Sequence, residues 1–148
     1  MQQKYMIAGH EKGQCRVMAW LPSAVVYAVI LYATWLPAPM GDMELPPFPG
    51  FDKVIHAVFG GGLAGAMIFD YTRGRASLRM APKAAVWYLA IVAMALMAID
   101  EAVQGMLPIE RTSDFADLLA DWLGVAVGAL TAPMATLWGL KRVRQRSR

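Results

Sequence analysis

The chain has 148 residues, 57% of them apolar and 17% charged, with a mean hydropathy of +0.40. This length leaves room for one domain, and the apolar content exceeds that of ordinary soluble domains. Cys15 is the single cysteine, so no disulfide forms within the chain. The composition therefore excludes a typical water-soluble enzyme and favours a small membrane protein.

Four apolar stretches approach the roughly 17–25 residues that cross a bilayer as a helix. They are residues 17–36, 54–69, 84–99 and 115–140. We expect an all-α membrane protein, folded as a compact antiparallel bundle of four transmembrane helices. In this organisation residues 1–16 form an N-terminal segment, residues 17–140 the membrane domain and residues 141–148 a basic tail.

The basic residues are unevenly distributed around these stretches. Three precede the first stretch, four lie between the second and third, and five follow the fourth, which is 12 of the 14 Lys and Arg. Because cytoplasmic loops are enriched in Lys and Arg, this pattern predicts that both termini are cytoplasmic. The net charge of +3 then reflects the membrane topology and a basic tail that binds anionic lipid head groups. We therefore expect membrane lipids, not nucleic acid, as partners.

Three further expectations concern the ends of the stretches. Trp20 and Trp35 bracket the first one, as aromatic residues do at membrane interfaces. The proline-rich residues 37–50 cannot continue a helix and are expected as an external loop. Asp70 is expected to pair with the arginines that follow it, and Ser113 to cap the fourth helix.

Small residues recur every four positions in two of the stretches. Ala57, Gly61 and Gly65 form such a series in the second stretch, and Gly124 and Gly128 form one in the fourth. Small residues allow helix backbones to approach closely in a membrane, where lipid supplies no hydrophobic drive. We expect these two faces to serve helix packing.

Ionisable residues gather at the predicted external ends of the last three stretches. The cluster comprises Asp52, Lys53, His56, Asp100, Glu101, Gln104, Arg111, Asp114, Asp117 and Asp121. Ionisable groups in a membrane are costly and normally face partners or a water-filled cavity, so an outward-facing pocket is the functional hypothesis. The structural alternative is a hydrogen-bonded plug in which Lys53 and Arg111 neutralise the acids and fix helix register.

Several chemistries lack their residues in this sequence. It has no GxSxG, CxxC or HExxH motif and only two histidines. What remains is recognition by charge, or acid–base chemistry with His56, Glu101 and Asp117 as candidate catalytic residues. His56 is open to a role as proton shuttle, metal ligand or structural residue, and we expect neither a metal nor a cofactor.

The polar motifs, in this order, resemble the VanZ-like family of small bacterial membrane proteins. The motifs are DKxxH at 52–56, DExxQ at 100–104, and then Arg111, Asp117, position 121, Gly124 and Gly128. The family is named for a protein that accompanies resistance to the glycopeptide teicoplanin, and the resemblance implies a multi-pass protein of the bacterial cytoplasmic (inner) membrane. The family usually has Asn at position 121, so Asp121 places a titratable group where a neutral one is usual.

Three functions follow as hypotheses. The first is a non-enzymatic envelope protein that binds a lipid- or cell-wall-related ligand, in envelope maintenance or glycopeptide resistance. Lys53 and Arg111 would meet an anionic head group, and the acids would meet cationic or hydroxyl groups. The second is an intramembrane hydrolase or transferase acting on a lipid-linked substrate, in which Asp52 orients His56 as general base. The third is a structural or partner-binding subunit in which the glycine faces pack between chains and not within one chain. The sequence leaves the oligomeric state open.

Overall fold

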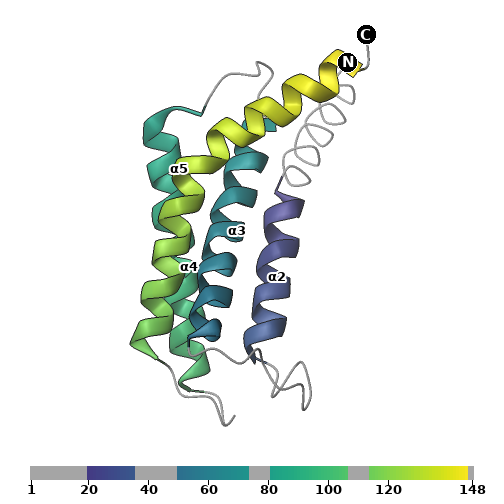
Figure 1. Cartoon of the computed structure of the whole chain (residues 1–148). Helices are drawn as coiled ribbons and strands as arrows, with labels where there is room; N and C mark the ends of the chain where they lie inside the picture. The colour runs from purple at the N-terminus through teal and green to yellow at the C-terminus, as the bar shows by residue number, and fades with distance from the viewer. Residues whose placement is uncertain (1–19, 36–49, 74–80, 107–113, 147–148) are drawn as a thin grey trace, which may run out of the picture.

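A computed structural model describes residues 20–35, 50–73, 81–106 and 114–146, which form four α-helices and, within these ranges, no strand (Figure 1). The helices are α2 (Leu21–Trp35), α3 (Phe51–Arg73), α4 (Lys83–Gln104) and α5 (Phe115–Arg146). The prediction of an all-helical chain is confirmed. Three helices contain segments long and apolar enough to cross a membrane, namely Phe51–Arg73, Lys83–Gln104 and Phe115–Gly139, whereas α2 has 15 residues.

The last three helices extend beyond the apolar stretches from which they were predicted. Helix α3 begins at Phe51, α4 ends at Gln104 and α5 continues to Arg146. Hydropathy marks only the apolar part of a helix, while backbone hydrogen bonding continues through polar residues at its ends. As a result, the described polar residues of the candidate site lie on helical turns, except Asp114, which precedes α5.

The starts of α3 and α5 have defined caps. Gly50 has a φ of 86°, a conformation that glycine adopts without steric cost, and its carbonyl accepts hydrogen bonds from the first turn of α3. Asp114 precedes α5, and its side-chain Oδ1 accepts the N–H of Ala116 at 2.9 Å. Asp114 therefore occupies the cap position that was expected of Ser113, a residue outside the described ranges.

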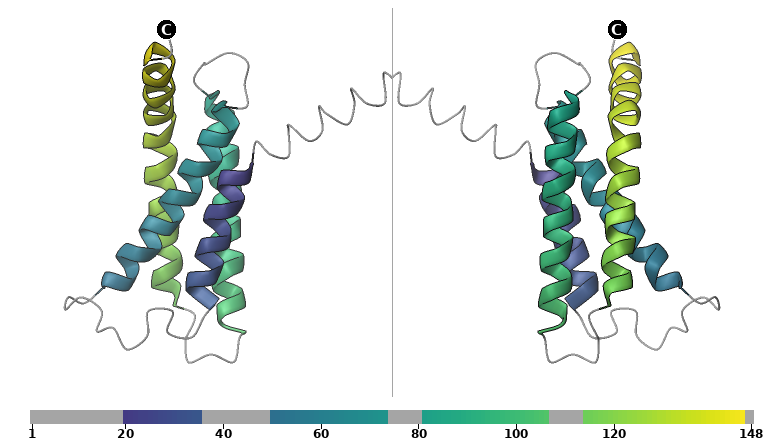
Figure 2. Two further views of the ribbon diagram at one scale, coloured as in Figure 1. Left: turned by 90° about the vertical axis from the view of Figure 1, so that its right-hand side faces the viewer. Right: turned by 90° about the vertical axis from the view of Figure 1, so that its left-hand side faces the viewer.

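The helix ends that meet define the arrangement of the bundle (Figure 1). Ser23, at the start of α2, contacts Asp70 near the end of α3. Thr34, near the end of α2, contacts Asp100 near the end of α4. Helices α2 and α4 therefore run in one direction and α3 in the other. Helix α5 runs with α3, because Lys53 at the start of α3 contacts Asp117 at the start of α5, and Figure 2 shows α3 crossing the others obliquely.

The core lies where the four helices meet, and large apolar side chains also cover the outside. Ile30, Leu63, Ile68, Met97 and Val125 are almost completely buried. Exposed large apolar side chains occur on all four helices and include Val29, Tyr32, Val58, Ile91, Leu123 and Leu130. Large apolar side chains exposed on every helix are unusual for a soluble protein and match a lipid environment.

Helices α3 and α5 form the most extensive contact in the bundle, and glycines make it possible. A Cβ atom on Gly124 would collide with the carbonyl oxygen of Ala57, and one on Gly60 with that of Asp121. A Cβ on Gly128 would lie 2.6 Å from the Gly61 carbonyl oxygen. By contrast, a Cβ on Gly65 would make an ordinary contact of 3.9 Å with Ala132. The close approach of the two backbones is thus concentrated in the half of the contact next to the polar cluster.

Candidate functional site

The start of α3, the end of α4 and the start of α5 meet at one end of the bundle and bring the predicted polar residues together (Figure 1). All residues of the predicted cluster are described except Arg111, which lies outside the described ranges. The carboxylates do not form one set. They separate into a group around Lys53, a group around His56 and a group around Asp100.

Lys53 is the centre of the most exposed group. Its Nζ lies 2.8 Å from Asp52, 3.1 Å from Asp114 and 2.7 Å from Asp117. The N–H of Ala116 and the Lys53 ammonium both lower the pKa of Asp114, which precedes α5, because they stabilise its charged form. With three carboxylates around one ammonium, this group is negative overall.

His56 lies one turn further along α3 and points toward α5. Its Nδ1 is 3.2 Å from Oδ2 of Asp121, and its Nε2 is 3.9 Å from Oδ2 of Asp117. Asp52, which was expected to orient His56, instead contacts Lys53 and is half-exposed. Asp52 and His56 share a helix face at i and i+4, but the Lys53 ammonium holds the Asp52 carboxylate at 2.8 Å.

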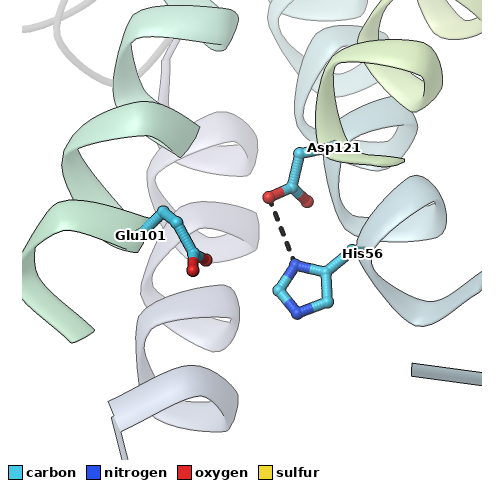
Figure 3. A group of neighbouring side chains, drawn as sticks. All are labelled: His56, Glu101 and Asp121. Atoms are coloured by element: carbon cyan, nitrogen blue, oxygen red, sulfur yellow. Dashed lines mark hydrogen bonds and ion pairs between the residues drawn. The ribbon is translucent and has the colours of Figure 1, made fainter. Parts of the chain in front are cut away.

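Glu101 reaches the same place from the last turn of α4. The side chain is 5% exposed, and its Oε1 accepts the N–H of Asp114 at 2.7 Å, just before α5 begins. Figure 3 shows Glu101, His56 and Asp121 converging from three different helices. One potential metal-ligand atom from each of these three residues lies within 4.8 Å of the others.

Asp100 is adjacent to Glu101 in sequence but faces α2. Its Oδ1 accepts hydrogen bonds from Thr34 Oγ1 at 3.1 Å and from Trp35 Nε1 at 2.6 Å. Its Oδ2 accepts one from Gln104 Nε2 at 3.2 Å. Successive residues on a helix are about 100° apart, so Asp100 and Glu101 cannot face the same neighbour. Asp100 and Gln104 therefore form a separate, fully bonded group.

Sequence reasoning missed the polar partners on α2. Trp35 was expected only at a membrane interface, and Thr34 was not singled out, because nothing in the sequence says which face of α4 meets α2. Asp70 is buried near the opposite end of the bundle and accepts hydrogen bonds from the backbone N–H and the Oγ of Ser23. Arg73 also lies at ion-pair distance, 3.5 Å from Asp70. Asp70 thus joins α3 to the start of α2 in addition to meeting the expected arginine.

A groove with a volume of about 580 Å³ begins at the Lys53 group and follows the exposed side of the α3–α5 contact. Its walls are almost entirely apolar, with Val54, Val58, Leu123 and Val127 among the lining side chains. Gly62 also lines it, and a Cβ atom built on Gly62 meets nothing within 4 Å. The absence of a side chain at this position keeps the groove open.

Long apolar helices, an apolar exterior and a cluster of buried ionisable groups at one end define a helical membrane protein with a polar site. The family model described as VanZ/LLP1 matches residues 4–137. The chain therefore belongs to the VanZ-like family, as its motifs indicated. Searches of curated proteins and of solved structures found no match to the chain.

Proposed function

We propose that this protein is a multi-pass protein of the bacterial cytoplasmic membrane that binds a lipid- or cell-wall-related amphiphile at its outer face. Both termini lie in the cytoplasm in this proposal. The distribution of 12 of 14 basic residues supports this orientation, because the polar cluster then lies on the side poor in Lys and Arg. The role that follows is in envelope maintenance, including glycopeptide resistance of the teicoplanin type.

The observation that carries the proposal is the continuity of the apolar groove with the polar group at Lys53. A ligand with an acyl or isoprenoid chain could place that chain against Val54, Val58 and Leu123. Its head would then lie beside Lys53 and the three carboxylates that form ion pairs with Lys53. An apolar cleft that ends in a few convergent polar groups is the usual form of a ligand site.

The charge of this group indicates the chemistry of the head. Lys53 is already bonded to Asp52, Asp114 and Asp117, so it is less available for an anion than the sequence suggested. The carboxylates retain free acceptor capacity, since an ionised carboxylate has two oxygens and about four lone-pair positions. We therefore favour a head that presents an ammonium group or sugar hydroxyls as donors.

Lipid retention in native mass spectrometry tests the groove. Gly62→Leu fills the groove at a position where a side chain meets no neighbouring helix, and it should lower the retained lipid several-fold. Gly139→Leu is the matched control, because Gly139 is also open but does not line the groove. Equal lipid retention by the two variants would remove the proposal.

The head-group preference is tested with phosphatidylethanolamine and phosphatidylglycerol that carry identical chains. The wild-type protein should retain more phosphatidylethanolamine, because its ammonium meets the carboxylates around Lys53. The double variant Asp52→Asn/Asp114→Asn should lose this preference while its total lipid retention stays the same. A preference for phosphatidylglycerol in the wild-type protein would contradict the assignment of the head.

The second candidate is an intramembrane hydrolase or transferase acting on a lipid-linked substrate. The contact between His56 and Asp121, with Glu101 close by, favours it, because a histidine held by a carboxylate is the usual arrangement of a general base. Asp121 then takes the orienting role first given to Asp52. Unchanged turnover of lipid-linked substrates in His56→Ala and Glu101→Gln variants would eliminate this candidate.

A further inference from the structure

The buried carboxylates of Glu101 and Asp121 are the feature from which a further site can be inferred. They are 5% and 1% exposed and approach His56 from α4 and α5 (Figure 3). In so apolar a protein, two carboxylates at this depth are costly unless a cation or several donors compensate them. The question is what supplies that compensation.

The described residues supply too little of it. Oδ1 of Asp121 is buried and has no hydrogen-bond partner among the described residues, and its Oδ2 has the single contact with His56. Lys53, the cation that the described ranges place at this end of the bundle, is held by Asp52, Asp114 and Asp117. A buried carboxylate oxygen without a donor loses its hydration and gains nothing in return, so it is rarely left unpaired without a functional reason.

We propose that His56, Glu101 and Asp121 bind a divalent transition-metal ion, with Zn²⁺ as the best match. The three residues provide one nitrogen and two carboxylate oxygens, a donor set that suits Zn²⁺ and, as second choice, Mn²⁺. The ion supplies the positive charge that the two buried carboxylates lack. Three protein ligands leave a coordination position open for water or for a ligand's oxygen.

The surroundings of the three residues match the outer shell of a metal site. A metal-binding histidine usually donates its second ring N–H to a carboxylate; the Asp117 carboxylate lies 3.9 Å from Nε2 of His56, an ion-pair distance that must shorten to about 3 Å for such a bond. Glu101 is held by the N–H of Asp114, so its carboxylate is oriented from outside the site. Glu101 thus has a partner outside the three residues, and Asp117 is placed to become one for His56.

The distances require a small closure around the ion. The ligand atoms lie within 4.8 Å of one another. In a tetrahedral site with bonds of about 2.1 Å, they would be about 3.4 Å apart. Rotation of the flexible Glu101 side chain, at the end of α4, can supply the difference. The metal site does not depend on a lipid in the groove, because His56, Glu101 and Asp121 do not line the groove.

The test uses the full-length protein, purified in detergent, stripped with EDTA and titrated with Zn²⁺ or Mn²⁺ alone. Calorimetry and elemental analysis should find one Zn²⁺ per chain and a rise in melting temperature on binding. Asp121→Asn and Glu101→Gln should each weaken Zn²⁺ binding at least 100-fold, and Asp117→Asn about 10-fold, as removal of an outer-shell partner does. Asp52→Asn is the control and should bind as the wild type does, because Asp52 contacts Lys53 and not the three ligands.

A readout from the wild-type protein keeps the test independent of variant folding. Co²⁺ in place of Zn²⁺ should give the visible absorption of a four-coordinate ion with nitrogen and oxygen ligands. A wild-type protein that takes up no stoichiometric metal overturns the proposal, and so does an Asp121→Asn variant that binds Zn²⁺ with wild-type affinity. Neither result bears on lipid retention by the groove, so the two proposals fail separately.

Discussion

Asp100 and Asp121 are the same residue type, equally buried at 1% exposure and located at the same end of the bundle, yet their surroundings differ. Asp100 accepts hydrogen bonds from Thr34, Trp35 and Gln104, so both of its oxygens are occupied. Asp121 contacts His56 through one oxygen, and its other oxygen has no partner among the described residues.

The difference separates two uses of a buried charge. A carboxylate with a full set of donors can fix the position of one helix against another, as Asp100 does for α2 and α4. A carboxylate with an unoccupied oxygen costs stability, and its retention indicates a binding partner that arrives from outside the chain. Disrupting the hydrogen bonds of the Asp100 group should therefore lower the stability of the protein. Neutralising the charge of Asp121 should leave the stability unchanged or raise it.

The largest expected effect concerns the helix contact that holds the Asp121 group in place. In Gly124→Ala the new Cβ would collide with the Ala57 carbonyl, so α3 and α5 must separate. We expect a loss of about 3 kcal/mol or more, or no folded protein, because overpacking forces backbone shifts. Tryptophan fluorescence during reversible unfolding in SDS measures it. Gly62→Ala is the control and should not destabilise, since its Cβ meets no atom within 4 Å.

The next effect concerns the Asp100 group. Asp100→Asn places an amide N–H₂ against donors, because Thr34 and Trp35 donate to one oxygen and Gln104 to the other. We expect a loss of about 1–3 kcal/mol in the same unfolding assay. Asp52→Asn makes the same chemical change at a half-exposed site and should change stability by less than about 0.5 kcal/mol. Equal losses in both variants would mean that the hydrogen bonds to Asp100 contribute nothing.

A smaller effect is expected at the opposite end of the bundle. Ser23→Ala removes the hydroxyl that donates to Asp70 but keeps the backbone N–H that also donates to it. The expected loss is about 1 kcal/mol, typical of one hydrogen bond at a helix start. Thr131→Val is the control, because its exposed hydroxyl bonds the Val127 carbonyl of its own helix. A larger loss in the control would contradict the role assigned to Asp70.

Much of the fold follows from the sequence because its determinants are local. The apolar stretches and the four-residue spacing of Gly124 and Gly128 each act within one helix or between two adjacent backbones. The family motifs likewise name residues that the structure brings to one end of the bundle. The apolar stretches are shorter than helices α3, α4 and α5, since hydropathy ends where polar residues begin and hydrogen bonding does not.

The partners within the site could not be derived in the same way. Whether Asp100 faces α2 or α5 depends on the rotation of α4 about its axis, which no local pattern specifies. The pairing of His56 with Asp121 in place of Asp52 depends on how closely α3 and α5 approach. Both are properties of tertiary packing, so one sequence without its structure predicts the members of the cluster but not their contacts.

Asp121 is a cation ligand in the proposed metal site, whereas Asp100 belongs to a complete hydrogen-bond group. The melting temperatures of Asp121→Asn and Asp100→Asn, compared with the wild type in detergent with EDTA, test this difference most directly. We expect Asp100→Asn to melt at a lower temperature than the wild type. Asp121→Asn should melt at the same temperature or higher, because an uncompensated buried charge is gone. If Asp121→Asn lowers the melting temperature as much as Asp100→Asn does, Asp121 is compensated by the chain itself and the distinction between the two carboxylates is wrong.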